Sequence, residues 1–289
     1  MPVAVRTSAG GIGDAVCAAY VAAGIKKKYP SSQVKFYTFH KPWLQDVIGV
    51  ELFPNNHFVN NGAPVYDLNH DYNGQLKNME NRKDWYAKAV PSTFHVVAPS
   101  MKRKYDNKKA KNTIVIAPFS HWKQRDWPLE KWLVLEDRLK RFYGYDVVVV
   151  GTSADKDGNR FDYSVFQSEV LVDRPAREVI DTMLESKCVV GNDSGIPHVS
   201  LMYDIPTVVV TAQIDADRLF SHTSVTAVRS GWDCSDCGFG HRKPYHVNCD
   251  KLCSSLASIS ALSVEKAIIE NARTTNALIV SDVVIKKVD

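Results

Sequence analysis

The sequence predicts an α/β protein with two doubly wound units, each built on a parallel sheet. Apolar runs rich in Val and Ile alternate with segments of helical period, in one series from residue 3 and in another from residue 112. This alternation is typical of βαβ units, because each parallel strand returns through a helix on the face of the sheet. The length of 289 residues suits two domains, and an apolar fraction of 45% suffices for a core in each.

The first series opens with a clear strand–turn–helix unit. VAVRT (3–7) predicts a strand, and a glycine-rich turn separates it from a helix over 15–30 that ends in three lysines and Pro30. A second strand is expected over 33–39. Shorter elements follow, namely a helix over 42–49 and strand-like pieces over 57–61 and 64–69.

The second series is more regular. NTIVIAPF (112–119) and YDVVVVG (145–151) predict buried parallel strands, and the helix between them is expected to start at Pro128 and end at Gly144. Further helices are expected over 177–186, 196–204 and 262–275, with strands over 188–191 and 206–212.

The domain boundary is expected in MKRKYDNKKAKN (101–112), which is polar, basic and without hydrophobic periodicity. We therefore predict one domain over 1–107 and a second over 108–289. Residues 1–111 carry 16 Lys and Arg against 8 Asp and Glu, whereas the remainder carries 20 against 24. The basic first part favours an anionic partner, although a solvated linker explains six of its cations equally well.

Three loops that follow predicted strands carry the polar residues expected of a ligand site. Open parallel sheets bind ligands beyond the carboxyl ends of their strands, so two such sheets are expected to border a cleft. The first loop, GGIGD (10–14), places Gly11 and Gly13 where the backbone can approach an anion at a helix start. Asp14 suits a base in the cleft, or alternatively an acid that complements the helix dipole.

The second loop is PFSHWKQRDWP (118–128), which leads into a helix. Its cations suit a phosphate, and the alternative is a solvated loop anchored by Trp127. The polar candidates in this loop are Ser120, His121, Lys123 and Arg125.

The third loop is GNDSGIPHVS (191–200), between two apolar strands. The first free backbone N–H groups of the following helix and the Ser194 hydroxyl would form an anion site that needs no metal. Asp193 and Ser194 could instead be simple N-caps, and His198 could be a structural histidine.

The glycine loop by itself would also suit a nucleotide-dependent oxidoreductase. The dinucleotide fingerprint is incomplete, because no third glycine follows Gly13 at the required spacing. The second strand ends in Phe39 and His40, without the acid that would hold a ribose. Both departures count against this class of enzyme.

The segments GGIGD, IAPFSHWKQRDWPLEKW and VVGNDSGIPHVSLMYDIPTVVV resemble, in order and spacing, the three signatures of the heptosyltransferase-like glycosyltransferases, glycosyltransferase family 9. The resemblance covers most of 108–270 and the first forty residues. It implies a GT-B fold, in which two Rossmann-like domains face a central cleft, and inverting transfer from a nucleotide sugar without a catalytic metal. It also implies that Asp14 is the general base and that Arg125 matches the basic residue before Trp-Pro. The turn that holds the donor phosphates in this family matches Asp193, Ser194, Gly195 and His198.

The chain also departs from the family pattern. Its first domain is short, and the helix after the glycine loop lacks the proline that is common there. Arg125-Asp126-Trp127 stands where Lys-Arg-Trp is common, and Pro197 replaces a bulkier apolar residue. Residues 40–100, where the acceptor would bind, show no match, so the resemblance does not identify the acceptor.

Four cysteines lie close together in a loop over 232–255, with the spacing C-x2-C-x11-C-x3-C. Two such pairs are typical of a tetrahedral thiolate site, which favours structural Zn in a cytoplasmic protein, with Fe also possible. Disulfides or free thiols are the alternative. Cysteine clusters at this position occur in some members of the resembled family. The expected ligands are Cys234, Cys237, Cys249 and Cys253.

We therefore expect an inverting glycosyltransferase that moves a sugar from a nucleotide-sugar donor to an anionic, lipopolysaccharide-like glycan. The basic first domain keeps a nucleic-acid acceptor as an alternative, together with a protein acceptor or a non-catalytic GT-B-like binding protein. The start MPVAVRTSAGG lacks a basic and apolar leader, and no apolar run reaches the ~18–20 residues of a membrane span. The cytoplasm is the expected compartment.

Overall fold

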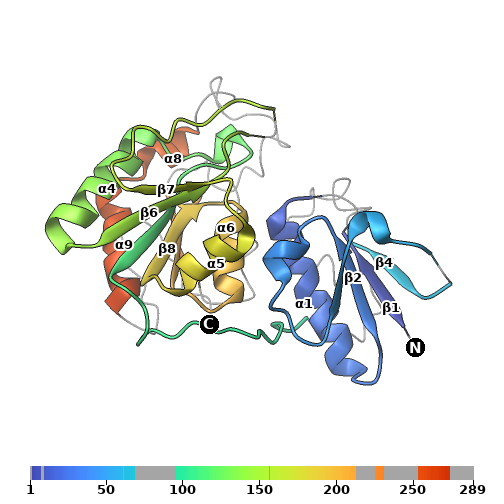
Figure 1. The fold of residues 1–289 in the computed structure, drawn as a ribbon. Coiled ribbons are helices and arrows are strands. Elements are labelled where there is room, and N and C mark those ends of the chain that lie inside the picture. Colours follow the sequence, from blue (N-terminus) through green and yellow to red (C-terminus); the bar gives the residue numbers. More distant parts are fainter. Residues whose placement is uncertain are drawn as a thin grey trace. The chain divides into compact units, whose positions relative to one another are not determined.

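The computed structural model describes residues 2–7, 10–60, 62–68, 96–155, 157–212, 225–230 and 253–273. The chain divides into two compact units, Met1–Lys104 and Tyr105–Asp289. Each unit has its own sheet, and all strand pairs in both sheets are parallel (Figure 1). By the resemblance, the first domain would bind the acceptor and the second the nucleotide-sugar donor, and both roles remain predictions.

The first unit is a four-stranded sheet in the order β3-β2-β1-β4. Helix α1 (Ile12–Lys28) packs against β1 and β2, and most of its residues are buried. From Ala15 to Ile25 its sequence is apolar on every side, and a helix without a polar face is stable only when it is covered. The strands are β1 (Val3–Arg6), β2 (Val34–Thr38), β3 (Glu51–Pro54) and β4 (Val65–Asp67).

Between β2 and β4 the structure differs from the expectation. The helix predicted over 42–49 is only a 3₁₀ turn, η1 (Lys41–Leu44), because the chain then extends and Val47 pairs with Met101. The strand predicted over 57–61 is wrong, since the chain pairs earlier as β3 and then turns through η2 (Asn55–His57). The strand predicted over 64–69 is β4.

The second unit is a six-stranded sheet in the order β10-β9-β8-β5-β6-β7. Four of its strands were predicted, whereas β7 and β10 are short strands that the sequence analysis missed. The six are β5 (Thr113–Ala117), β6 (Asp146–Gly151), β7 (Glu169–Val172), β8 (Cys188–Asn192), β9 (Thr207–Val210) and β10 (Thr226–Val228).

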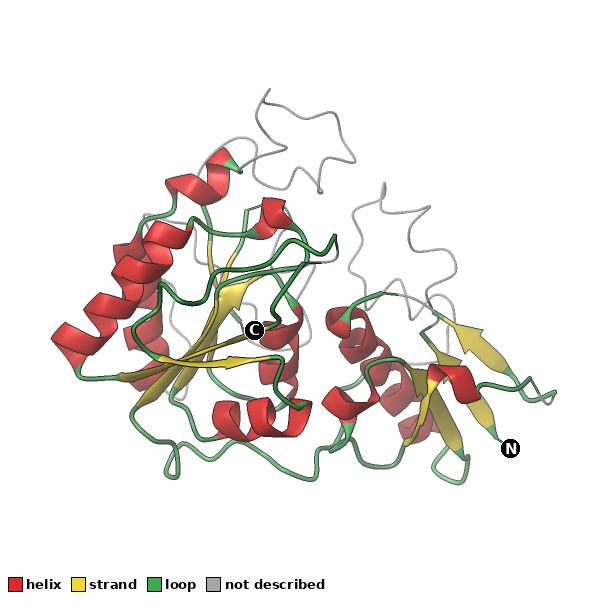
Figure 2. Ribbon diagram, turned by 45° about the horizontal axis from the view of Figure 1, so that its top comes forward, coloured by secondary structure: helices red, strands yellow, loops and turns green. Residues whose placement is uncertain are grey.

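Helices cover both faces of this sheet. Helices α4 (Leu129–Tyr143) and α9 (Ala261–Arg273) pack together on one face, and α5 (Ala176–Leu184) and α6 (Gly195–Met202) pack together on the other (Figures 1 and 2). A short helix, α8 (Ser254–Ser258), precedes α9 and was not predicted. Among the described residues, no helix is long and apolar enough to cross a membrane.

The strand order fixes where a ligand site can form. In the second unit the chain builds β5, β6 and β7 outward in one direction and then returns to place β8 on the other side of β5. In the first unit β1 likewise has β2 on one side and β4 on the other. Such a reversal is a topological switch point, at which loops from neighbouring strands diverge and leave room for a ligand. The loops predicted to hold the site follow β1, β5 and β8, and therefore lie at these two points.

The basic stretch 101–112 is anchored rather than freely solvated. Lys102 donates its backbone N–H to the Asp46 carbonyl at 2.7 Å, and Arg103 Nε donates to the Asp46 carboxylate at 2.6 Å. In the second unit, Lys111 bonds Glu185 through both its backbone N–H and its ammonium group. Lys109 Nζ also lies 3.7 Å from Asp106 Oδ2, so three of the six cations are paired with carboxylates.

Candidate functional site

The loop between β5 and α4 is closed by its own polar groups. Ser120 donates its backbone N–H to Asp126 Oδ1 at 2.7 Å, and its hydroxyl donates to the Trp122 carbonyl at 2.7 Å. The following residues form a 3₁₀ turn, η4 (Lys123–Arg125), in which Arg125 N–H donates to the Trp122 carbonyl at 2.8 Å. Ser120, expected to bind the donor, is therefore a buried residue that fastens the loop.

Near the end of β8, Gly191 lies where its neighbours leave little room for a side chain. A Cβ at Gly191 would lie 3.1 Å from both Ala117 Cβ and the Ala117 carbonyl oxygen, and 3.2 Å from Pro197 Cγ. Glycine thus lets β8, β5 and the start of α6 approach closely, which brings Asn192 beside the β5 loop.

The two loops meet through the side chain of Asn192, which is fully buried. Its Oδ1 accepts the Trp127 backbone N–H at 3.1 Å, and its Nδ2 donates to the Pro118 carbonyl at 2.6 Å and lies 3.4 Å from Asp126 Oδ1. A single amide therefore ties the end of β8 to both ends of the β5–α4 loop.

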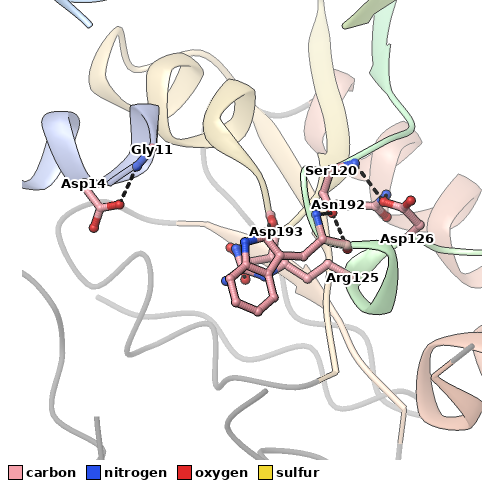
Figure 3. Close-up of polar contacts among 8 residues, drawn as sticks. Gly11, Asp14, Ser120, Arg125, Asp126, Asn192 and Asp193 are labelled. Carbon is pink, nitrogen blue, oxygen red and sulfur yellow. Dashed lines mark hydrogen bonds and ion pairs between the residues drawn. The ribbon is translucent and has the colours of Figure 1, made fainter. Parts of the chain in front are cut away.

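Arg125 crosses from its loop to the β8–α6 turn. Its Nη1 lies 3.4 Å from Asp193 Oδ2 and 3.3 Å from the Asp193 carbonyl oxygen (Figure 3). The guanidinium also lies over the Trp122 ring, 5.6 Å from its centroid. A cation held at the start of a helix in this way is suited to an anionic ligand.

Ser194 is the N-cap residue of α6, but its side chain makes no capping hydrogen bond. Its Oγ is buried, and no described residue offers it a hydrogen-bond partner. The simple N-cap interpretation is therefore not observed in the described part of the chain. The first turn of α6 contains no acidic residue, and the carboxylate of Asp193, one residue before the N-cap, is paired with Arg125.

Asp126, which follows Arg125 in the chain, is a partly buried carboxyl group. Burial raises its pKa from 3.8 to about 7, against the lowering effects of the hydrogen bonds from Ser120 and the charge of Lys123. Asp155 raises this pKa further through repulsion. The group thus changes its charge close to neutral pH.

The remaining predicted residues of the second unit surround this site. Gly195 is the first residue of α6, and His198 is buried within that helix. Lys123 is exposed at the start of η4, and His121 is exposed in the same loop. Their expected contacts with a donor remain predictions.

In the first unit, the glycine loop leads into α1 through Gly10, whose φ of 94° favours glycine. Gly11 is the N-cap residue, and its N–H donates to Asp14 Oδ2 at 2.7 Å (Figure 3). Asp14 is 8% exposed and lies in the first turn, with Gly13 buried beside it. The Gly11 N–H, expected to face an anion, is thus used by the carboxylate of its own helix.

The four-cysteine loop lies largely outside the described residues, which exclude Cys234, Cys237 and Cys249. Cys253 is the N-cap residue of α8 and packs against the hydrophobic core of the second unit. Within the described ranges, no three His, Cys, Asp or Glu side chains form a potential metal site. The predicted site therefore remains a prediction.

Sequence reasoning missed three residues at the second switch point. Asn192 stood inside the GNDSG motif without a role, and Asp126 was noted only because it departs from the family pattern. Trp122, 40% exposed beside Arg125, was not considered. An amide that ends a buried strand is a usable signal, because such a group needs partners from a neighbouring loop.

Comparisons with known proteins add the family. No curated protein sequence matches the chain. The model of glycosyltransferase family 9 (heptosyltransferase) matches residues 72–235, which is more than half of the chain.

Several solved structures share the fold. The iron-containing dodecameric glycosyltransferase TibC from enterotoxigenic E. coli is 15% identical, with a TM-score of 0.72, over 94% of this chain and 76% of TibC. The ADP-heptose lipopolysaccharide heptosyltransferase II of E. coli is 14% identical, with a TM-score of 0.63, over 94% of this chain and 99% of its own. A family 9 glycosyl transferase from Veillonella parvula is 15% identical, with a TM-score of 0.64, over 94% of this chain and 97% of its own.

These likenesses show an α/β fold with two parallel sheets of the GT-B-like heptosyltransferase type. Together with the family match, they confirm the resemblance drawn from the three loop motifs. The chain belongs to glycosyltransferase family 9, the heptosyltransferase family, and is a glycosyltransferase.

Proposed function

We propose that this glycosyltransferase moves a sugar, with inversion and without a catalytic metal, from a nucleotide-sugar donor to a lipopolysaccharide-like glycan. The observation that carries the proposal is the start of α6, where Arg125 lies against Asp193 and the buried Ser194 hydroxyl has no partner among the described residues. Free backbone N–H groups, a hydroxyl and a guanidinium at one switch point are suited to a diphosphate.

The donor class follows from the same site and from two relatives. TibC has been solved with ADP-D-beta-D-heptose, and the E. coli heptosyltransferase WaaC with ADP. We infer that the donor of this protein is also a nucleoside diphosphate sugar, with an ADP-sugar as the first candidate.

The leaving group is the diphosphate, which gains negative charge as its bond to the anomeric carbon breaks. Arg125 and the α6 N–H groups would stabilise this charge, and such preorganised electrostatic stabilisation is the largest contribution in many enzymes. Asp193 contributes by holding the guanidinium, since both its carbonyl and its carboxylate lie within 3.4 Å of Nη1.

Asp14 is the proposed base. It would take the proton of the acceptor hydroxyl while that oxygen attacks the anomeric carbon, and the diphosphate would leave from the opposite face. One of its oxygens accepts the Gly11 N–H, which orients the carboxylate at the start of α1.

The acceptor is proposed to be an anionic glycan rather than nucleic acid or protein. The net positive charge of residues 1–111 supports an anionic partner. A long phosphate backbone is less suited, because Arg103 and Lys111 in the basic stretch are engaged by Asp46 and Glu185.

We also propose a structural metal, Zn or Fe, held by Cys234, Cys237, Cys249 and Cys253 in a cytoplasmic enzyme. The spacing of the cysteines supports a tetrahedral thiolate site, and TibC, a relative of the same fold, is an iron-containing protein. Elemental analysis of the purified protein should give about one metal ion per chain. Cys234→Ser and Cys237→Ser together should lose that metal, and a metal-free wild-type protein would contradict the proposal.

The decisive experiment is calorimetric titration with ADP-, UDP-, GDP- and CMP-sugars. One nucleotide sugar should bind the wild-type protein, and Arg125→Ala should weaken that binding and lower the transfer rate by ~10²-fold or more. Arg177→Ala is the matched control, because Arg177 forms an exposed ion pair with Asp181 on α5. Equal affinity of both variants for the donor would show that Arg125 does not bind it. If no nucleotide sugar in the panel binds the wild-type protein, the donor assignment is contradicted.

A further inference from the structure

Two side chains that the proposed chemistry does not use form hydrogen bonds with the loop that carries Arg125. We propose that Asn192 and Asp126 are positioning residues, which hold the loop that carries Arg125 against the start of α6. The inference rests on the proposed function of that site, since it assigns a purpose to the fixed position of Arg125.

Asn192 is placed to act on both loops at once. It ends β8, one residue before Asp193. It bonds the first residue of the β5–α4 loop, Pro118, and the last but one, Trp127. A buried amide with both ends satisfied fixes the separation of the groups that it joins. Any movement of the loop away from α6 must break these bonds inside the protein, where water does not replace them.

Asp126 closes the same loop from within. Its Oδ1 accepts the Ser120 N–H and lies 3.4 Å from Asn192 Nδ2. One oxygen therefore contacts both the start of the loop and the end of β8. Arg125 therefore precedes two consecutive residues, Asp126 and Trp127, that are both tied to Asn192. Its backbone is held on the other side by the Trp122 carbonyl.

This anchoring matters because a long cationic side chain is mobile by default. An arginine on a free loop loses backbone as well as rotamer entropy when it binds a phosphate, and that loss weakens binding. A backbone fixed at both neighbours removes part of the loss in advance. Misplacement by ~1 Å is enough to cost ~10²-fold in rate when a group must be aligned with the leaving group.

Hydrogen–deuterium exchange measures the anchoring without any ligand. Asn192→Ala should speed exchange in peptides covering 118–127 by ~10-fold or more, because the loop would open locally. The matched control is Asn271→Ala, which removes another buried amide of the same unit, bonded to Thr226 and Ala267. This control should leave exchange over 118–127 unchanged.

Asp126 supplies a second test. Asp126→Asn retains an oxygen that can accept the Ser120 N–H and should keep the loop protected, whereas Asp126→Ala should not. Asn192→Asp would place a second carboxyl group beside that of Asp126, in place of the amide donor. Adding Asp126→Asn would restore one donor and one acceptor between positions 126 and 192. The double variant should therefore recover part of the protection lost in Asn192→Asp.

ADP binding and transfer kinetics connect the loop to the site. Asn192→Ala should weaken ADP binding by several fold and lower kcat, because Arg125 would no longer be held in place, whereas Asn271→Ala should change neither. Exchange over 118–127 that is the same in Asn192→Ala and Asn271→Ala would overturn the positioning role. So would a double variant no better than Asn192→Asp. Failure of the wild-type protein to bind ADP would instead contradict the donor proposal and leave the exchange result standing.

Discussion

The two switch points have the same topology, but the helices that begin there are capped differently. At the start of α1, Asp14 lies in the first turn and its carboxylate accepts the Gly11 N–H. At the start of α6, Ser194 makes no capping hydrogen bond and no acid lies in the first turn. The positive end of α1 is thus balanced by its own carboxylate, whereas that of α6 is left for a ligand.

This difference in capping favours opposite chemical roles for the loop before α1 and the loop before α6. A carboxylate at a helix start repels a diphosphate unless a cation is paired with it, as Arg125 is with Asp193. The first loop therefore suits a base and the second suits an anion. The predicted donor contacts of Gly11 and Gly13 are therefore the weakest part of the proposed site. Four substitutions would break or sharpen this comparison.

The largest effect is expected at Asp14. Asp14→Asn keeps an oxygen that can cap Gly11 but removes the base, so transfer should fall by ~10²–10⁴-fold while stability changes little. Asp14→Ala should lose the same activity and about a further 1 kcal/mol of stability, because the cap is lost. Steady-state kinetics and urea unfolding of both variants check this. A transfer rate near the wild-type value in Asp14→Asn would show that the carboxylate is only a cap.

A second effect concerns Asp126, whose neighbours include Lys123 on its own loop and Asp155 and Tyr163 beyond β6. Its pKa is about 7 in the folded protein and near 4 when unfolded, so the folded state holds the proton more tightly. The resulting stability is complete below about pH 4 and is lost as pH rises to about 7. The unfolding free energy of the wild-type protein should therefore fall by up to ~4 kcal/mol relative to Asp126→Asn between pH 4 and 8.

Urea unfolding followed by tryptophan fluorescence at several pH values measures this difference. Parallel pH profiles of the wild-type protein and Asp126→Asn would contradict the raised pKa. If the unfolding free energy of the wild-type protein instead fell relative to Asp126→Asn as the pH is lowered, folding would lower the pKa of Asp126. The folded state would then stabilise the carboxylate.

A third substitution gives α6 the acid that α1 already has. Pro197 is the third residue of α6, as Asp14 is the third residue of α1. Pro197→Asp should weaken ADP binding by ~10-fold relative to Pro197→Asn, because a fixed negative charge would occupy the positive helix end. The asparagine variant controls for shape and for the loss of proline. Equal calorimetric affinities would show that the anion does not bind at this helix start.

The smallest effect is expected at Ser194. Since its hydroxyl caps nothing, Ser194→Ala should change the unfolding free energy by less than the ~1 kcal/mol typical of a capping serine. ADP affinity should fall by several fold, corresponding to one hydrogen bond of about 1 kcal/mol. A variant that loses stability but binds ADP normally would show that the hydroxyl is structural.

The sequence by itself determined the alternation of strands and helices and the loops that carry the site. Hydrophobic period, proline and glycine act over a few residues, so α4, with Pro128 before it and Gly144 after it, could be predicted closely. The motif loops were recognisable for the same reason, because each is continuous in sequence. Short elements such as η1, β7 and β10 were misjudged or missed, since pairing partners rather than local preference decide them.

Only the tertiary structure decided which polar groups are satisfied. Asn192 and Trp127 are 65 residues apart and meet because the crossover sets β8 beside β5. Local sequence could not show that Asp14 serves its own helix while Ser194 has no partner in the described structure. Hydrogen bonding in a protein interior depends on every neighbour within about 3 Å, and folding brings most of those neighbours from distant parts of the chain.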